Sequence, residues 1–314
     1  FFSATQIGMT ATPKETAYIS NIDYFGEPIY KYSLKEGIDD GFLAPFKVIR
    51  IKTDIDEEWR PRKGQRDIYG YEIEDRIYNN SDYDYNIIIQ DRIDMVANEI
   101  TNYLKATDRM AKTIVFCATE DAAERMRVAL RKLNADMCAE NPDYIVRITG
   151  SDEYGKSKLD YFISVSAKYP VIATTSKLLS TGADCKMVKL IVIDEMIGSM
   201  TEFKQIIGRG TRLRYEDGKT HFVIMDFRGV TRLFADPDWD GPIEQDEQFR
   251  HVDPKEPDGE PVIMPAPPVE SKHKYVVDSR GCKVTISQRM VSVYDTDGKL
   301  LRQDSIIDYT KAYI

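Results

Sequence analysis

Short apolar runs alternate with amphipathic stretches between residues 86 and 226 of this chain. Apolar residues three and four positions apart predict helices over 86–106, 120–133, 157–167 and 200–208. Short continuous apolar runs predict strands over 113–117, 144–149, 171–175, 188–193 and 220–226. Apolar strands that alternate with helices are typical of a parallel sheet covered on both faces. The pattern therefore predicts an α/β fold with a mostly parallel sheet flanked by helices.

The residues before this region predict a connection to a preceding domain. An apolar stretch that ends in a turn over 1–13 is expected to be the end of that domain, and residues 14–45 are expected to be a connector. Residues 46–234 are predicted to form the main domain, which begins with an alternating strand over 47–53. The polar residues 54–85, rich in Tyr and Asp, are expected to be a surface insertion.

The residues after the main domain change composition abruptly. Residues 235–270 contain eight of the fourteen prolines, eleven acidic residues and two basic ones, so they predict an acidic linker. Strand patterns resume at 275–277, 283–286 and 291–294, and the turn sequence 295–298 follows. Residues 271–314 are therefore predicted to be a small C-terminal β-hairpin unit that leads to a truncated helical region.

Charge and cysteine usage narrow the class of protein. The net charge of −9 arises in 235–270, and the acidic and basic residues of the remaining chain balance, so nucleic-acid binding is not excluded. No large basic stripe is present, and we expect weak DNA binding by this chain alone. The four cysteines and three histidines lack metal-ligand spacing, which excludes a recognisable zinc site and suits a reducing cytoplasm. No apolar run approaches the roughly 20 residues of a membrane span, and no signal-peptide pattern is present.

Three short motifs carry candidate chemistry. Gln205-Ile-Ile-Gly-Arg-Gly-Thr-Arg212 places two arginines three residues apart, and guanidinium groups suit phosphate stabilisation. Thr174-Thr-Ser176, followed by Gly182-Ala-Asp184, places hydroxyls after a strand, where they could contact nucleic-acid phosphates. Thr10-Ala-Thr-Pro13 follows an apolar stretch. Each motif alone is also compatible with a basic helix end, a plain turn or a helix cap.

In this order the three motifs resemble motifs VI, V and III of superfamily-2 helicases, and 112–119 resembles motif IV. Wider stretches are similar to the R subunit of type I restriction–modification enzymes: 7–13, 24–28, 37–45, 147–150 and 203–212. The resemblance as a whole extends over most of residues 1–230 and, more loosely, over 271–314. The resemblance implies the second RecA-like (P-loop NTPase-type) domain of an ATP-dependent double-stranded DNA translocase that uses ATP and Mg²⁺. It also implies double-stranded DNA, methylation and specificity subunits as partners, and a cytoplasmic location.

The resemblance assigns roles residue by residue. It implies that Arg209 and Arg212 reach the ATP γ-phosphate, and that Gln205, Gly208, Gly182 and Asp184 line the ATP cleft. Thr10, Ala11 and Thr12 would couple hydrolysis to domain movement. The implied DNA contacts are Cys117, Thr119, Thr149, Gly150, Lys156, Thr174, Thr175 and Ser176. The family's Walker A and B motifs and its nuclease domain would lie upstream of residue 1, so this chain alone is expected to be inactive, and no metal ligand is assigned to it.

Two patterns imitate other sites. Gly150-Ser-Asp-Glu-Tyr-Gly-Lys-Ser157 fits a Walker A loop, and Leu190-Ile-Val-Ile-Asp-Glu195 fits a Walker B strand, which together would suggest a self-contained P-loop ATPase. The acids within the first loop would oppose a polyphosphate. Pro257-Asp258 and Glu270-Ser-Lys272 imitate a nuclease motif but lie in the proline-rich segment. A scaffold without catalysis that docks other subunits, and a strand-separating helicase, remain alternatives.

Overall fold

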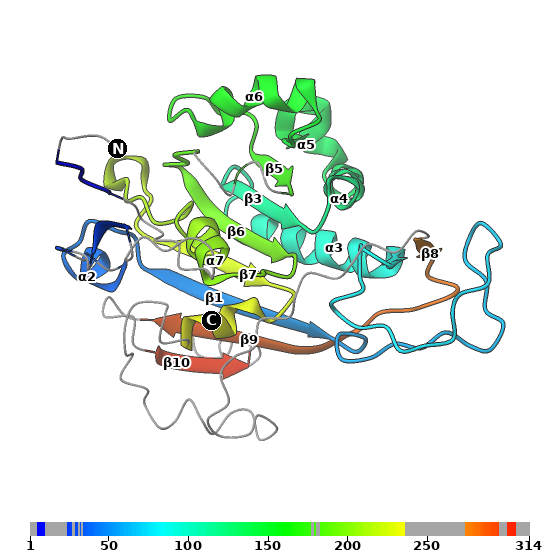
Figure 1. Cartoon of the computed structure of the whole chain (residues 1–314). Helices are drawn as coiled ribbons and strands as arrows, with labels where there is room; N and C mark the ends of the chain where they lie inside the picture. The colour runs from blue at the N-terminus through cyan, green and yellow to red at the C-terminus, as the bar shows by residue number, and fades with distance from the viewer. Residues whose placement is uncertain are drawn as a thin grey trace.

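The structure is a computed structural model of the chain (Figure 1), and it describes residues 5–9, 24–26, 29–30, 32, 34–176, 179, 183–235, 274–294 and 300–305. The coupling residues Thr10, Ala11 and Thr12 lie outside this part, as do Gly182, nearly all of the acidic linker and the expected turn at 295–298. Residues 5–9 are exposed and form no strand.

An eight-stranded sheet organises the molecule, in the order β10-β9-β1-β7-β6-β3-β5-β4. Six neighbouring strands are parallel: β1 (Phe46–Thr53), β7 (Phe222–Asp226), β6 (Val188–Asp194), β3 (Lys112–Cys117), β5 (Ile172–Thr175) and β4 (Ile145–Arg147). Every residue of β3, β5 and β7 is buried, as expected where both faces of a parallel sheet are covered. The predicted α/β fold, with a mostly parallel sheet flanked by helices, is confirmed.

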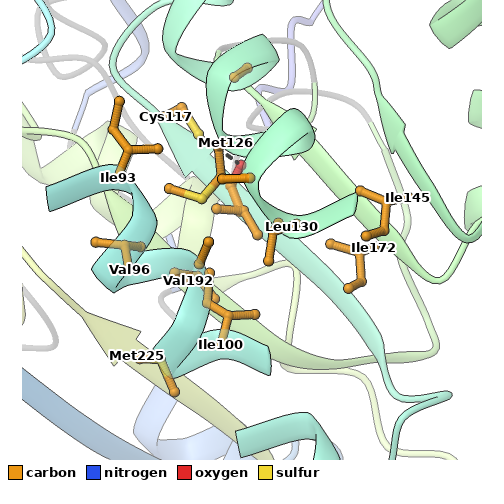
Figure 2. Close-up of a cluster of buried hydrophobic side chains, with 14 of the residues drawn as sticks. Ile93, Val96, Ile100, Cys117, Met126, Leu130, Ile145, Ile172, Val192 and Met225 are labelled. Carbon is orange, nitrogen blue, oxygen red and sulfur yellow. Dashed lines mark hydrogen bonds between the residues drawn. The ribbon is translucent and has the colours of Figure 1, made fainter. Parts of the chain in front are cut away.

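Helices cover both faces of the sheet. On one face, α3 (Gln90–Ala106) and α4 (Glu120–Leu133) pack their apolar sides against the strands, and the short α5 (Ala135–Glu140) follows. Figure 2 shows this core, where side chains of α3 and α4 meet those of β3, β4, β5, β6 and β7. On the other face lie α2 (Leu34–Asp39), α6 (Glu153–Ile163), α7 (Met200–Ile207) and the 3-10 segment η4 (Val230–Ala235). Two further 3-10 turns are η1 (Pro142–Tyr144) and η3 (Tyr215–Asp217).

Side-chain caps explain where several helices begin. The Thr119 hydroxyl accepts a hydrogen bond from the Ala122 amide at 3.0 Å and starts α4 as predicted. The Asp152 carboxylate accepts from the Gly155 amide at 3.0 Å, so α6 begins at Glu153 and not at 157. The prediction missed this start because a capping aspartate lies one turn before the apolar pattern becomes periodic.

The C-terminal strands join the main body. β9 (Ile286–Tyr294) and β10 (Leu300–Ser305) form the expected antiparallel hairpin, and β9 extends the large sheet by pairing with β1. β8 (Tyr275–Val277) pairs in parallel with β2 (Ile87–Ile89) as a second small sheet. How the chain divides into domains remains a prediction, but the hairpin shares its sheet with residues 46–53.

No helix in the described ranges is both long and apolar enough to cross a membrane.

Candidate functional site

The arginine motif forms the turn that ends α7. Ser199 caps this helix by accepting from the Glu202 amide at 3.1 Å, and Phe203, Ile206 and Ile207 bury its inner face. Gly210 then passes directly over a ring: a Cβ there would lie 2.2 Å from the Phe222 Cδ2 atom. The motif needs glycine at this position because the turn packs against the start of β7.

Contacts from other loops hold both arginines at the amino ends of the parallel strands. Arg209 donates from Nη1 to the Ala183 carbonyl, and Arg212 donates from Nε to Asp184 Oδ1 at 3.1 Å. The Ala44 amide, just before β1, donates to the Thr211 carbonyl at 2.7 Å. The structure therefore brings together Arg209, Arg212 and Asp184, which the sequence separates by up to 28 residues.

The two guanidinium groups differ in exposure. The Arg212 side chain is 55% exposed and the Asp184 side chain 50%, so their ion pair is a surface contact worth on the order of 0.5 kcal/mol. Arg209 is half-buried, and burial lowers its pKa, an effect that Cys185 and Asp184 oppose. Gln205 is half-buried one turn earlier on α7, and Gly208, the C-cap, is exposed.

The predicted DNA-contacting hydroxyls lie at the opposite, carboxyl edge of the sheet. Thr174 and Thr175 end β5, and Thr149 follows β4. All three side chains are fully buried, and none of their hydroxyls has a hydrogen-bond partner among the described residues. A buried hydroxyl without a partner costs about 1–3 kcal/mol, so a fold retains such a group at a cost in stability. Ser176 directly follows the strand and is also buried.

The other predicted DNA contacts are more varied. Gly150 and Lys156 are exposed near the same edge. The Thr119 hydroxyl is engaged as the cap of α4, and the Cys117 thiol is buried, donates to the Val115 carbonyl at 3.7 Å, and has its pKa raised by burial. The side chains of Thr119 and Cys117 are therefore engaged within the fold and do not present a free polar group to a ligand. Their backbone lies at the end of β3, where it could make the contact.

A buried ionic network at the carboxyl edge was missed from the sequence. Asp194, the last residue of β6, accepts from Arg92 at 2.7 Å and from Arg228 at 2.8 Å. Arg228 also donates to Asp84 at 2.6 Å and to the Asn80 carbonyl at 2.8 Å. Single-sequence patterns treat charged residues as exposed, and the only signal was that Asp194 and Arg228 each lie beside the end of an apolar strand.

The charges in this network compensate one another. Burial alone would raise the pKa of Asp194, but Arg92 and Arg228 more than offset it and hold the pKa below its ordinary value. Burial outweighs Arg228 at Asp84, whose pKa is raised. Both arginine side chains are at most 2% exposed, and Arg92 has two guanidinium nitrogens without a partner among the described residues.

Hydrogen bonds made by residues 150–157 argue against a nucleotide-binding P-loop there. The amide of Gly155 donates to the Asp152 carboxylate, and the amide of Ser151 donates to Glu120 at 3.2 Å. A phosphate cradle needs such amides directed at an anion, and here carboxylates take them. Asp194 in the Walker B-like strand is likewise engaged by two arginines. Across the described ranges, no three His, Cys, Asp or Glu side chains form a group that could hold a metal ion.

No protein-family model matches the chain. The chain is 47% identical, over 99% of its length, to the type I restriction enzyme EcoAI endonuclease subunit of Escherichia coli. It is 31% identical, over 72% of its length, to the EcoKI endonuclease subunit of Escherichia coli K12. It spans 42% and 20%, respectively, of the lengths of these two relatives.

A solved structure supports the same relationship. A fragment of an HsdR subunit of a type I restriction enzyme from Vibrio vulnificus YJ016 superposes with a TM-score of 0.62 and 42% sequence identity. That superposition covers 77% of this chain and 43% of the other.

Proposed function

Because this chain is a homologue of type I restriction enzyme endonuclease subunits over almost its full length, we propose that it supplies the second RecA-like half of an ATP-driven double-stranded DNA translocase. In this proposal ATP binds between an upstream motor domain and the amino edge of this sheet. Mg²⁺ would be held mainly by that upstream domain. Methylation and specificity subunits would complete the restriction complex, and DNA cleavage would belong to an upstream nuclease domain.

The observation that carries the proposal is the arrangement of Arg209 and Arg212. The Ala183 carbonyl fixes Arg209, while an exposed ion pair with Asp184 holds the side chain of Arg212 among the described residues. An exposed pair is weak, so Arg212 can exchange Asp184 for a phosphate oxygen at little cost. When ATP is bound, its γ-phosphoryl group would be transferred to water. The two guanidinium groups would stabilise the negative charge that develops on this group during hydrolysis.

Residues at the other edge of the sheet would contact DNA. We assign this role to Thr149, Thr174 and Thr175 from their motif resemblance. Their hydroxyls lack partners among the described residues, and because they are buried, the residues around them would have to move aside for a phosphate to reach them. Ser176, the backbone at Cys117, Thr119 and Gly150, and the exposed Lys156 would add phosphate contacts. Gln205, Gly208 and Asp184 would border the nucleotide. The two ligands would thus occupy opposite edges of one sheet, so closure on ATP would move the DNA-contacting edge.

The test is DNA-stimulated ATP hydrolysis by this chain and by a version extended upstream. In the extended protein, Arg212→Ala is expected to lower kcat by about 10³-fold or more, because arginine fingers contribute roughly 10³–10⁵. Arg214→Ala is the matched control: this arginine lies two residues away but pairs with Asp217 at 2.7 Å. Equal losses in both variants would remove the assigned role of Arg212.

The alternatives give different results in the same assay. A self-contained P-loop ATPase predicts hydrolysis by the short chain and its loss in Lys156→Ala. A docking scaffold predicts that charge reversal within 235–270 disrupts assembly while ATP hydrolysis by the whole subunit survives. A strand-separating helicase predicts displacement of a labelled strand, which a duplex translocase does not produce.

A further inference from the structure

The insertion after β1 forms a packed arm. Residues 54–85 leave the carboxyl end of β1 and return to β2, and residues 274–285 lie against them through the β2–β8 pairing. This arm has its own hydrophobic core: Ile55, Ile73, Tyr78, Tyr83, Ile87, Ile89, Val277, Cys282 and Val284. Figure 1 shows its loops projecting past the arrowheads of β1, β6 and β7. The arm therefore extends beyond the carboxyl edge of the sheet.

The buried ionic network fixes the arm to that edge. Arg228, which follows β7, donates to Asp84 and to the Asn80 carbonyl of the arm while it also holds Asp194 of β6. The Val284 amide donates to Asp91 of α3 at 2.7 Å, and Thr285 pairs with Asp54 at the base. An arm held by fully buried ion pairs keeps its surface at a fixed place relative to the strand ends.

The outer loop of the arm is basic. Residues 60–66 contain four cations and no acid: Arg60, Arg62, Lys63 and Arg66. Arg60 is paired with Asp75 at 2.7 Å. Arg62 and Lys63 are exposed and form no ion pair within the described ranges.

A hollow of about 450 Å³ lies beside this loop. Its cationic lining is Arg62, Lys63, Arg66 and Arg280, and its acids are already engaged. Asp67 is buried and accepts from the Tyr69 and Tyr71 amides at 2.9 Å each, and Asp278 pairs with Arg280. The hollow therefore presents cationic side chains to an anion and offers few unengaged carboxylates to repel it.

We propose that the arm is a second DNA-contacting element, in which Arg62 and Lys63 bind backbone phosphates of the duplex that passes the carboxyl edge. This inference rests on the proposed function, because the same edge carries Thr149, Thr174 and Thr175. Lysine and arginine contacts to phosphate carry no sequence information, which suits a motor that moves along any sequence. The arm lengthens the contact in the direction in which the strands point.

The experiment measures binding of a fluorescent 30-base-pair duplex to the whole chain by anisotropy, between 50 and 200 mM salt. Each phosphate contact contributes about 0.9 to the slope of log affinity against log salt, so Arg62→Ala/Lys63→Ala should reduce the slope by about 1.8. Between 50 and 200 mM salt, the variant should therefore lose about tenfold less affinity than the wild-type protein loses. Lys105→Ala/Lys132→Ala is the matched control, since these exposed lysines end α3 and α4 at the opposite edge.

The salt dependence separates DNA contact by the arm from DNA contact at the strand ends. A reduced slope for Arg62→Ala/Lys63→Ala, with the wild-type slope for the control, supports the arm as a DNA contact. A wild-type slope for Arg62→Ala/Lys63→Ala overturns it. If Thr174→Val/Thr175→Val then weakens binding, DNA contact at the strand ends survives although the arm contact fails. A chain that binds no duplex at 50 mM overturns both.

Discussion

The buried hydroxyl of Thr175 leads us to a prediction about the stability of the fold that does not depend on the proposed function. Its side chain is fully buried at the end of β5, in register with Phe116 of β3, and the hydroxyl has no partner among the described residues. Valine has the same shape and the same preference for strands, so Thr175→Val leaves no cavity and removes only the hydroxyl.

The expected effect is stabilisation. An unpartnered buried polar group costs about 1–3 kcal/mol, so Thr175→Val should raise the free energy of unfolding by about 1 kcal/mol or more. For a domain of this size that raises Tm by roughly 2–4 °C. Urea titration and thermal melts would measure the two quantities. DNA affinity should fall in the same variant if the hydroxyl contacts a phosphate.

Thr231→Val is the matched control. The Thr231 hydroxyl is equally buried but donates to Asp226 Oδ2 at 2.6 Å, so its removal should destabilise the fold by about 1–3 kcal/mol. If Thr175→Val destabilises the protein as much as Thr231→Val does, the Thr175 hydroxyl is hydrogen-bonded within the fold and the reasoning is refuted. If stability rises but DNA affinity is unchanged, only the functional assignment fails.

Three further predictions concern the network, a buried lysine and the arginine turn. Arg228→Met should lower the free energy of unfolding by about 3–5 kcal/mol in urea titrations, because it removes the ion-pair partner of the buried Asp84 and leaves Asp194 with Arg92 alone. Arg125→Met, which breaks a surface pair with Asp121, should change the free energy of unfolding by less than about 1 kcal/mol. Burial lowers the pKa of Lys219 to about 8, so above pH 8 the folded protein releases a proton that the unfolded chain keeps. The free energy of unfolding of the wild-type protein should therefore rise from pH 8 to 9 relative to that of Lys219→Met. Parallel curves of unfolding free energy against pH for the two proteins would contradict this. Gly210→Ala should melt at a lower temperature and lose ATP hydrolysis in the extended protein, since its Cβ would overlap the Phe222 ring; an unchanged melt would show that the turn yields easily.

The hydrophobic pattern alone determined the fold class and most elements of the main sheet. Strands such as β3 and β6 each contain a continuous apolar run, 114–117 and 190–193, because helices cover both of their faces, and such a run is visible in the sequence. The Gln205–Arg212 motif was visible for the same reason, because a helix end and its turn are local. The start of α6 was not visible in the hydrophobic pattern, because the capping carboxylate of Asp152 sets where this helix begins.

The contacts between distant residues became visible in the three-dimensional structure. It placed Arg209 and Arg212 against Ala183 and Asp184 at one edge of the sheet, and the threonine hydroxyls at the other. It also joined β9 to β1 and turned the polar insertion into an arm anchored by Arg228. Hydrophobic periodicity records burial but not partners, so ion pairs between segments more than a hundred residues apart leave no trace in the sequence pattern.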